Sequence, residues 1–328
     1  MLPLYPFAVE QFDLRAYDLV ISSESGPTKG VLTNADTCHI CYCHTPMRYL
    51  WDFYQEYKTR SGLGRIGRLA FALTCHYARI WDYMSAARVD YFVANSMNVS
   101  KRIQKIYGRE AEVIYPPVDV SSVVLDRPRG DHYLAVGQLV SYKRFDLAIE
   151  ACNRLGRQLR IVGQGEEYKS LRKQAGETVR FLGPLSDGEL KEQYALCRAV
   201  LFPGEEDFGI VPVEAQAAGT PVVAFGRGGA TETVIGVTET TESIAEKATG
   251  IFFPQQSVDS IEEAVLKFER IEQQFSSHFI RDHARQFHQQ YFKESMHRFI
   301  TETLEVHRQR SAAPPILDPA ITTSRVSF

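Results

Sequence analysis

The residues with the clearest chemical potential lie in one stretch, GEEDFGIVPVEAQAAGTPVVAFGRGG, which spans residues 204–229. Pro212 suits the first turn of a short helix and Gly219 suits its end. The backbone amides of residues 209–211 would then lack helical acceptors at a helix N-terminus, where the dipole favours negative charge. The pattern predicts an anion site that fits a phosphate group.

Two glutamates flank this anion site. Glu206 precedes it, and Glu214 follows eight residues later inside the expected helix. A carboxylate beside a phosphate would be repelled, so both side chains are better suited to accept hydrogen bonds from hydroxyl groups, such as those of a sugar and a ribose. The alternative interpretation is structural, because acidic side chains at a helix N-terminus also stabilise the helix dipole.

Basic and imidazole side chains that could bind a substrate occur at two other places in the sequence. Lys143 and Arg144 precede an expected helix, where the dipole disfavours cations by about 0.3–1 kcal/mol unless an anion binds between them. Otherwise they form an ordinary solvated pair. His44 ends an expected strand, at the edge of a parallel sheet where ligands bind. The alternative is a structural histidine whose hydrogen bonds are satisfied within the core or a loop.

A zinc interpretation of the cluster Cys38, Cys41, Cys43 and His44 is weak. In a strand Cys41 and Cys43 face one side while Cys38 faces the other, and the sequence offers no second Cys/His cluster to complete a tetrahedral site. It also contains no D-x-D motif, G-x-G-x-x-G fingerprint or P-loop. We therefore expect no metal and no cofactor, only a substrate at the anion site.

These residues must be positioned by alternating strands and helices. Ser96 and Gly108 suit the two ends of one helix, and Ser186 with Glu189 forms a capping box for another. Strands are expected over residues 17–23, 39–44, 90–95, 112–119, 132–137, 158–163, 179–183, 199–203 and 221–225. Most of them are continuous apolar runs, which indicates parallel sheets with both faces covered by helices.

The 204–229 stretch resembles the E-x7-E region of family 4 retaining glycosyltransferases, which have the two-domain GT-B fold. The resemblance extends over residues 2–308 and includes YCHTPMRYLWD, VIYPPVD, VGQLVSYKRFDLAIEA, IVGQGEE and VRFLGPLSDGEL. YCHTPMRYLWD and EEDFGIVPVEAQAAG are most similar to the mannosyltransferase branch. The resemblance implies transfer of a hexose from a nucleoside diphosphate sugar, with GDP-mannose favoured, to a lipid-linked or glycan acceptor.

The resemblance also implies roles for individual residues. His44, Glu206 and Lys143 would form the catalytic group, with the first two at the donor sugar and the lysine at the leaving diphosphate. The implied donor-binding residues are Glu214 at the ribose, the amides of Phe208, Gly209, Ile210 and Val211 at the diphosphate, Arg144 beside Lys143, Gln138 where many relatives carry arginine, and Leu185 and Asp187 at the base.

We expect a GT-B-like α/β protein with two Rossmann-like parallel-sheet domains, the first incomplete. An acceptor-side domain would occupy residues 1–120 and a nucleotide-sugar-binding domain residues 129–285, with a helix over 286–310 that can cross back and a disordered tail over 311–328. The opening LPLYPFAVEQFD resembles an internal segment of the first domain, so several strands would be missing. The alternatives are a non-catalytic nucleotide-sugar-binding fragment and another GT-B enzyme, such as a nucleotide-sugar epimerase.

Charge and composition limit the other partners. With 328 residues and a net charge of −3, the chain is too acidic for a typical nucleic-acid binder. Six cysteines in a chain of this length favour the cytoplasm, and the N-terminus is a poor signal peptide. Residues 58–109 carry ten basic and two acidic residues. This segment either meets anionic lipid at the inner membrane face or a phosphate-bearing acceptor, or it is a solvated helix face.

Overall fold

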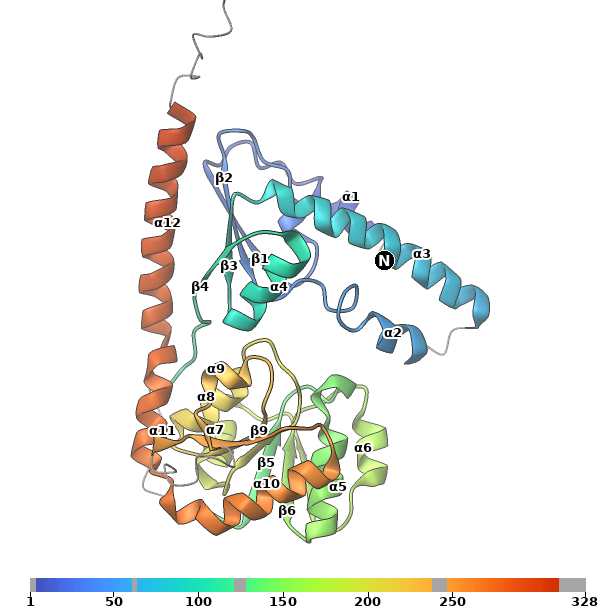
Figure 1. Ribbon diagram of the computed structural model, residues 1–328, viewed down its shortest axis with the longest axis vertical. Helices are drawn as coiled ribbons and strands as arrows, with labels where there is room; N and C mark the ends of the chain where they lie inside the picture. The colour runs from blue at the N-terminus through green and yellow to red at the C-terminus, as the bar shows by residue number, and fades with distance from the viewer. Residues whose placement is uncertain (1–3, 61–63, 121–127, 238–246, 313–328) are drawn as a thin grey trace, which may run out of the picture.

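The computed structural model describes residues 4–60, 64–120, 128–237 and 247–312, and it has two parallel sheets, one above the other in Figure 1. The upper sheet runs in chain order: β1 (Leu19–Glu24), β2 (Cys38–Cys43), β3 (Tyr91–Ala94) and β4 (Ala111–Val113). The helices of this part are α1 (Tyr5–Val9), α2 (Tyr54–Arg60), α3 (Arg65–Ser85) and α4 (Met97–Tyr107). Ser96 and Gly108 cap α4 as predicted, with Gly108 at φ 66°.

Among the described residues, the second sheet has seven parallel strands in the order β10-β11-β9-β8-β5-β6-β7. In chain order they are β5 (His132–Val136), β6 (Gln158–Val162), β7 (Val179–Gly183), β8 (Val200–Phe202), β9 (Val222–Phe225), β10 (Gly236–Val237) and β11 (Gly250–Phe253). The chain moves outward from β5 to β7 and then returns to the other side of β5 with β8. A topological switch point therefore lies between β5 and β8, and ligands bind outside the carboxyl ends of the strands at such a point.

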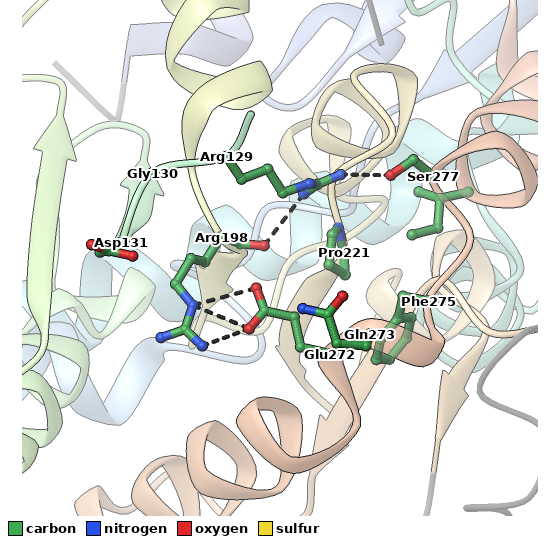
Figure 2. A pocket seen from close by; sticks show the side chains of 10 residues that line it. Arg129, Gly130, Asp131, Arg198, Pro221, Glu272, Gln273, Phe275 and Ser277 are labelled. Atoms are coloured by element: carbon green, nitrogen blue, oxygen red, sulfur yellow. Dashed lines mark hydrogen bonds and ion pairs between the residues drawn. The ribbon is translucent and has the colours of Figure 1, made fainter. Parts of the chain in front are cut away.

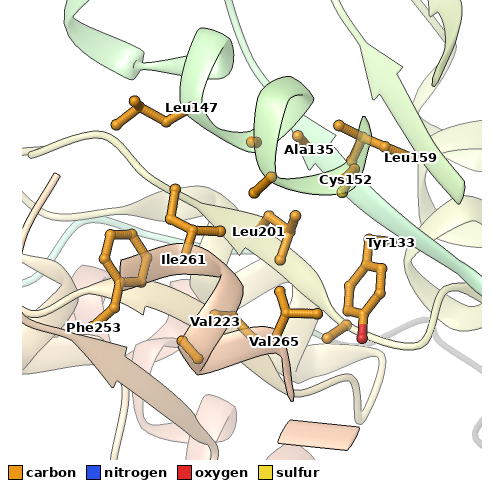
Figure 3. Packing of buried hydrophobic residues seen from close by; sticks show 14 of the residues in the cluster. Tyr133, Ala135, Leu147, Cys152, Leu159, Leu201, Val223, Phe253, Ile261 and Val265 are labelled. Carbon is orange, nitrogen blue, oxygen red and sulfur yellow. The ribbon is translucent and has the colours of Figure 1, made fainter. Parts of the chain in front are cut away.

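Both faces of this second sheet are covered by helices, which explains its continuous apolar strands. The helices are α5 (Phe145–Leu155), α6 (Tyr168–Gln174), α7 (Asp187–Leu196), α8 (Ile210–Ala217), α9 (Ala230–Thr233), α10 (Val258–Ile271) and α11 (Ser277–Ala284). On one face Tyr133, Leu159 and Leu201 pack under α5 and α10 (Figure 3). On the other face Leu134 and Val200 pack with α7 and α8. The predicted Ser186–Glu189 capping box is present at α7.

Helix α12 (Gln289–Ala312) leaves the second domain and runs along the first sheet (Figure 1). Its residues Phe292, Met296, Phe299, Ile300 and Leu304 pack against a cluster that includes Cys38, Ile40 and Tyr42 of β2. The spacing of four, three, one and four residues places these side chains on one helical face. The expected helix thus continues to Ala312 rather than ending at residue 310, and the remainder of the expected tail, 313–328, lies outside the described residues.

The connection between the two sheets packs with the second domain. Val118 and Val120 share a buried cluster with Phe208 and Phe287, and Val118 bridges to His288. The chain therefore joins the packing of the second domain before residue 120, the expected end of the first domain.

Candidate functional site

The loops that follow β5 and β8 meet at the switch point of the second sheet. Lys143 ends a short 3-10 turn after β5, and Glu206 lies in the turn after β8. The two side chains form an ion pair with 2.9 Å between Lys143 Nζ and Glu206 Oε1, and both are mostly buried. The structure thus brings together the cation and the carboxylate that the sequence analysis assigned to a diphosphate and a sugar.

Two glycines allow Lys143 to take this position. Gly137 has φ 145°, and a Cβ atom there would lie 2.9 Å from Lys143 Nζ. At Gly204 a Cβ atom would lie 2.9 Å from Lys143 Cα. Neither residue was predicted as part of the site, although both glycines lie at or near the end of a buried strand.

Arg144 takes a different direction from its neighbour. Among the described residues it is the one non-glycine residue with a positive φ, at 53°. Its guanidinium pairs with Asp146, with 2.9 Å between Nη2 and Oδ2. The recorded contacts therefore place Arg144 with Asp146 and not with the Lys143–Glu206 pair.

Gly209 shapes the predicted anion site. Its φ of 92° turns the chain into α8, and few residues with a side chain adopt that conformation. Within the described chain, the amides of residues 208–211 have no protein acceptor. The Phe208 ring is buried with its centroid 5.6 Å from that of Tyr115 and 5.5 Å from that of Phe287, which fixes the turn. Ile210 and Val211 then form the first turn of α8.

Glu214 lies one turn further into α8. The hydroxyl of Tyr194 donates to its carboxylate at 2.8 Å. Burial raises the pKa of Glu214, while this hydrogen bond and the charge of Lys191 act in the opposite direction and Asp187 adds to the increase. Asp187 is the first residue of α7, and Leu185 packs just before it. These two predicted residues therefore lie at the start of the helix that carries Tyr194, the partner of Glu214.

Gln138 lines a shallow groove of about 750 Å³ along the carboxyl ends of β5, β6 and β7. The other lining residues are Gly137, Gly163, Gln164, Gly165, Tyr168 and Pro184. Gly163 and Gly165 bring the loops together, because Cβ atoms there would lie 1.9 Å from the Gly137 carbonyl oxygen and 2.3 Å from that of Leu139. The groove adjoins Lys143 through Gly137.

His44 lies at the corresponding edge of the first sheet, directly after β2. Its Nε2 is 2.9 Å from Ser23 Oγ, and burial lowers the pKa of the imidazole. The following loop reaches the second domain, where Arg48 donates to the carbonyl oxygen of Glu205 at 3.2 Å. His44 therefore precedes the loop that meets the Glu206 turn, while its own ring contacts Ser23 and Tyr42 of the first domain.

Several contacts between the domains could not be inferred from sequence spacing. Arg102 pairs with Asp207, and Ser96 Oγ donates to the Asp207 carbonyl oxygen at 2.6 Å. Glu232 of α9 accepts from the amides of Met97 and Asn98, at 2.7 and 2.8 Å, and thus completes the N-terminus of α4. These partners lie more than a hundred residues apart, so only the serine cap could be recognised in the sequence.

A separate cavity of about 540 Å³ lies at the other edge of the second sheet (Figure 2). It is lined by Arg129, just before β5, and by Arg198, just before β8, so it faces the amino ends of the strands. Its two arginines already have protein partners, since Arg198 pairs with Glu272 and Arg129 donates to Ser277. Ligands of open α/β sheets bind at the opposite edge, which favours the switch-point site.

The basic segment 58–109 does not form one open face. Four of its arginines bind protein groups: Arg79 donates to Leu50, Arg88 to Gly30, Arg102 to Asp207 and Arg109 to Ala86. Arg65, Lys101 and Lys105 are exposed. In the part of the chain that the structure describes, no helix combines the length and apolarity needed to cross a bilayer.

Residues 126–286 match the family model described as glycosyl transferases group 1. The chain is 29% identical over 159 residues to the O-antigen chain mannosyltransferase RfbU of Salmonella typhimurium, which is 45% of each protein. It is 28% identical over 232 residues to the alpha-1,3/1,6-mannosyltransferase ALG2 of Homo sapiens, which is 60% of this chain and 53% of that one. The chain spans about half the length of these curated relatives.

Among solved structures, HepE of Anabaena in complex with UDP has a TM-score of 0.58 at 17% identity. The match covers 92% of this chain and 95% of HepE. At this identity the likeness establishes the fold, which is an α/β arrangement of parallel sheets of the GT-B type.

Proposed function

We propose that this chain, whose residues 126–286 form a group 1 glycosyltransferase domain, transfers a hexose from a nucleoside diphosphate sugar to a glycan or lipid-linked acceptor with retention of configuration. We favour mannose from GDP-mannose, because both curated relatives described above are named mannosyltransferases. The observation that carries the proposal is the set of unpaired amides at residues 208–211 beside the Lys143–Glu206 pair at the switch point.

In this proposal the leaving diphosphate is held by the amides at the start of α8 and by Lys143. Donors that are already oriented toward the developing negative charge lower the barrier to departure, since they need no reorganisation. The dipole of α8 acts in the same direction. Once Lys143 turns toward the diphosphate, Glu206 is free to accept hydrogen bonds from hydroxyls of the sugar.

The remaining residues position the two substrates. Glu214, supported by Tyr194, would hold the ribose, and the groove beside Gln138 would take the base. His44 would contact the sugar from the first domain. The acceptor hydroxyl attacks from the face that the diphosphate leaves, so the departing diphosphate oxygen is the base nearest to the hydroxyl proton. Retention then needs no covalent bond to a side chain.

We also propose that the protein works at the cytoplasmic face of a membrane with anionic lipids. Helix α3 exposes one apolar stripe along its length, consisting of Ile66, Leu69, Leu73, Tyr77, Ile80 and Met84. Arg65 and Arg68 flank the start of this stripe. Apolar insertion together with basic residues is the usual basis of interfacial binding.

Flotation with anionic vesicles tests the membrane proposal. The fraction of protein that floats should decrease when Leu69 and Leu73 are replaced by serine. Absence of flotation by the unaltered protein at low salt would contradict this part of the proposal.

Turnover with a panel of GDP- and UDP-sugars tests the main proposal. Calorimetry measures donor binding, and NMR of the product assigns the anomeric configuration. Glu206→Ala should abolish turnover and weaken binding of the sugar nucleotide without weakening binding of the free nucleoside diphosphate. Glu263→Ala, on the exposed side of α10, is the matched control. An inverted product, or unchanged donor binding by Glu206→Ala, would contradict the proposal.

A further inference from the structure

Three side chains from distant parts of the chain meet at one edge of the first sheet. Cys38 begins β2, Asp90 directly precedes β3, and His307 lies near the end of α12. The Cys38 sulfur, a carboxylate oxygen of Asp90 and a ring nitrogen of His307 all lie within 4.8 Å of one another. The group is separate from the switch-point site, which lies in the second domain.

Two of these side chains have no evident structural partner for their polar atoms. His307 Nε2 is buried without a hydrogen-bond partner, which is unusual for a polar atom in a folded protein. The Cys38 thiol is fully buried. Asp90 uses Oδ2 to accept from the His39 amide at 2.7 Å, and this contact orients the carboxylate and leaves its second oxygen available.

We propose that Cys38, Asp90 and His307 bind a zinc ion that ties the end of α12 to the first sheet. Thiolate, imidazole and carboxylate are the three ligand types that zinc takes from proteins, at about 2.0–2.3 Å, and a water molecule completes the tetrahedron. One thiolate and one carboxylate neutralise the two charges of the ion, which suits a partly buried position. Ligand atoms within 4.8 Å of one another need only small rotamer changes to close around it.

The proton balance is simple. At neutral pH an unligated cysteine is mostly in the protonated thiol form. When the sulfur–zinc bond forms, the thiol proton passes to solvent, and His307 binds through a nitrogen that carries no proton. No oxidant or reductant is involved.

The site differs from the zinc cluster that the sequence analysis rejected. Cys41 and Cys43 pack on the α4 side of β2, whereas Cys38 faces α12, as strand alternation requires. The other ligands of the proposed site come from residues far along the chain, so no local spacing reveals it. Because α12 begins beside the second domain, the ion would fix the far end of the helix that connects the two domains.

Titration of the chelator-treated full chain with cobalt(II), a spectroscopic substitute for zinc, tests the proposal. We expect one equivalent to bind, with a thiolate-to-cobalt charge-transfer absorption that zinc removes by competition. Cys38→Ala should abolish this absorption, and His307→Ala should weaken cobalt binding by at least about 100-fold. Cys41→Ala, from the same strand but its other face, should retain both the absorption and the affinity.

A second measurement separates metal binding from loss of folding. Zinc should raise the Tm of the unaltered chain and of Cys41→Ala but leave the Tm of His307→Ala unchanged. Circular dichroism checks that each variant is folded. No binding by the unaltered chain, or charge-transfer absorption that persists in Cys38→Ala, would overturn the proposal.

Discussion

Lys143 and Glu206 are each other's counter-ions, with 2.9 Å between Nζ and Oε1. In the function proposed above, a bound diphosphate would bring two or more negative charges next to this pair and compete for the lysine. Glu206 would then lose its partner and gain acceptor capacity for hydroxyl groups. The proposal therefore couples binding of the diphosphate to recognition of the sugar through one side chain.

Replacement of Lys143 by alanine should therefore affect diphosphates selectively. We expect the Kd of a nucleoside diphosphate to rise by about 10- to 100-fold, which corresponds to one lost charge-assisted contact. The Kd of the corresponding monophosphate should change by less than about threefold, because it lacks the second phosphate. Isothermal titration calorimetry measures both values. Lys173→Ala, on the exposed side of α6, is the control, and equal losses for the two ligands would contradict the assigned role.

Several residues proposed for this site lie together in the structure, because their sequence signals are local. Glu206, Gly209 and Glu214 belong to one turn and helix, and Lys143 stands at a recognisable helix start. The orientation of the Arg144 side chain could not be predicted. It follows from a positive φ at this residue, and the side chain pairs with Asp146. The proposed zinc site also could not be inferred from sequence spacing, since its three residues come from separate elements.

At the level of the element, α8 depends on the backbone conformation of Gly209. An added Cβ atom would meet Pro212 Cγ at 3.4 Å, so the cost of Gly209→Ala comes from φ 92° rather than from lack of space. We expect a loss of about 1–2 kcal/mol in the free energy of unfolding, together with weaker diphosphate binding as the amides turn away. Urea denaturation and calorimetry measure the two effects. Gly188→Ala in α7 has open space and no positive φ, so it should cost nothing.

The free energy of unfolding should depend on pH through His132, the first residue of β5. Burial, together with the charge of Arg160, lowers its pKa to about 4. The unfolded chain has the usual value near 6.5, so below that pH it binds the proton more readily than the folded chain. The free energy of unfolding should therefore fall as the pH drops from about 6.5 to 4, with an upper limit of about 3 kcal/mol for this residue.

Urea denaturation at pH 7 and pH 4.5 checks this expectation. His132→Gln should show a smaller loss of stability between the two pH values than the unaltered protein. His278→Gln, at an exposed position of α11, should show the same loss as the unaltered protein. An identical pH dependence in His132→Gln would show that other groups cause it.

Individual helices and strands could be predicted well, because helix caps and apolar runs are signals within short stretches of sequence. The Ser186–Glu189 box, the Ser96 cap and the glycine after α4 all lie where the sequence indicated. The order of the strands could not be predicted in the same way. That β8 returns beside β5 is a property of the whole sheet, and it is this order that places Lys143 next to Glu206.

At the level of the whole molecule, two kinds of contact join the domains. Helix α12 buries an apolar face against the first sheet and provides a permanent connection. Across the site, most contacts are polar: Arg48 and Arg102 meet Asp207, and Glu232 meets the start of α4. One aromatic contact adds to them, since Phe53 stacks on Tyr142 with 5.7 Å between the ring centroids. Polar contacts that water can replace separate more easily than an apolar face, so the two domains should open at the site and pivot near α12.

Glu232 offers a direct measure of this opening. Its carboxylate accepts from the amides of Met97 and Asn98, which have no acceptor within their own helix. The two amides are protected only while the domains are closed, so Glu232→Ala should raise their hydrogen-exchange rates by about tenfold, equivalent to about 1.4 kcal/mol.

Exchange at amides in the middle of α4 should not change, because Ser96 still caps the helix. Glu263→Ala, which lies away from the site, should leave all of these rates unaltered. A diphosphate ligand that closes the domains should slow exchange at Met97 and Asn98 in the unaltered protein and have no such effect in Glu232→Ala. If exchange at these two amides is the same in Glu232→Ala as in the unaltered protein, the contact does not report closure, and the domains are held together by other contacts, such as those of the arginines, the Phe53–Tyr142 stack and α12.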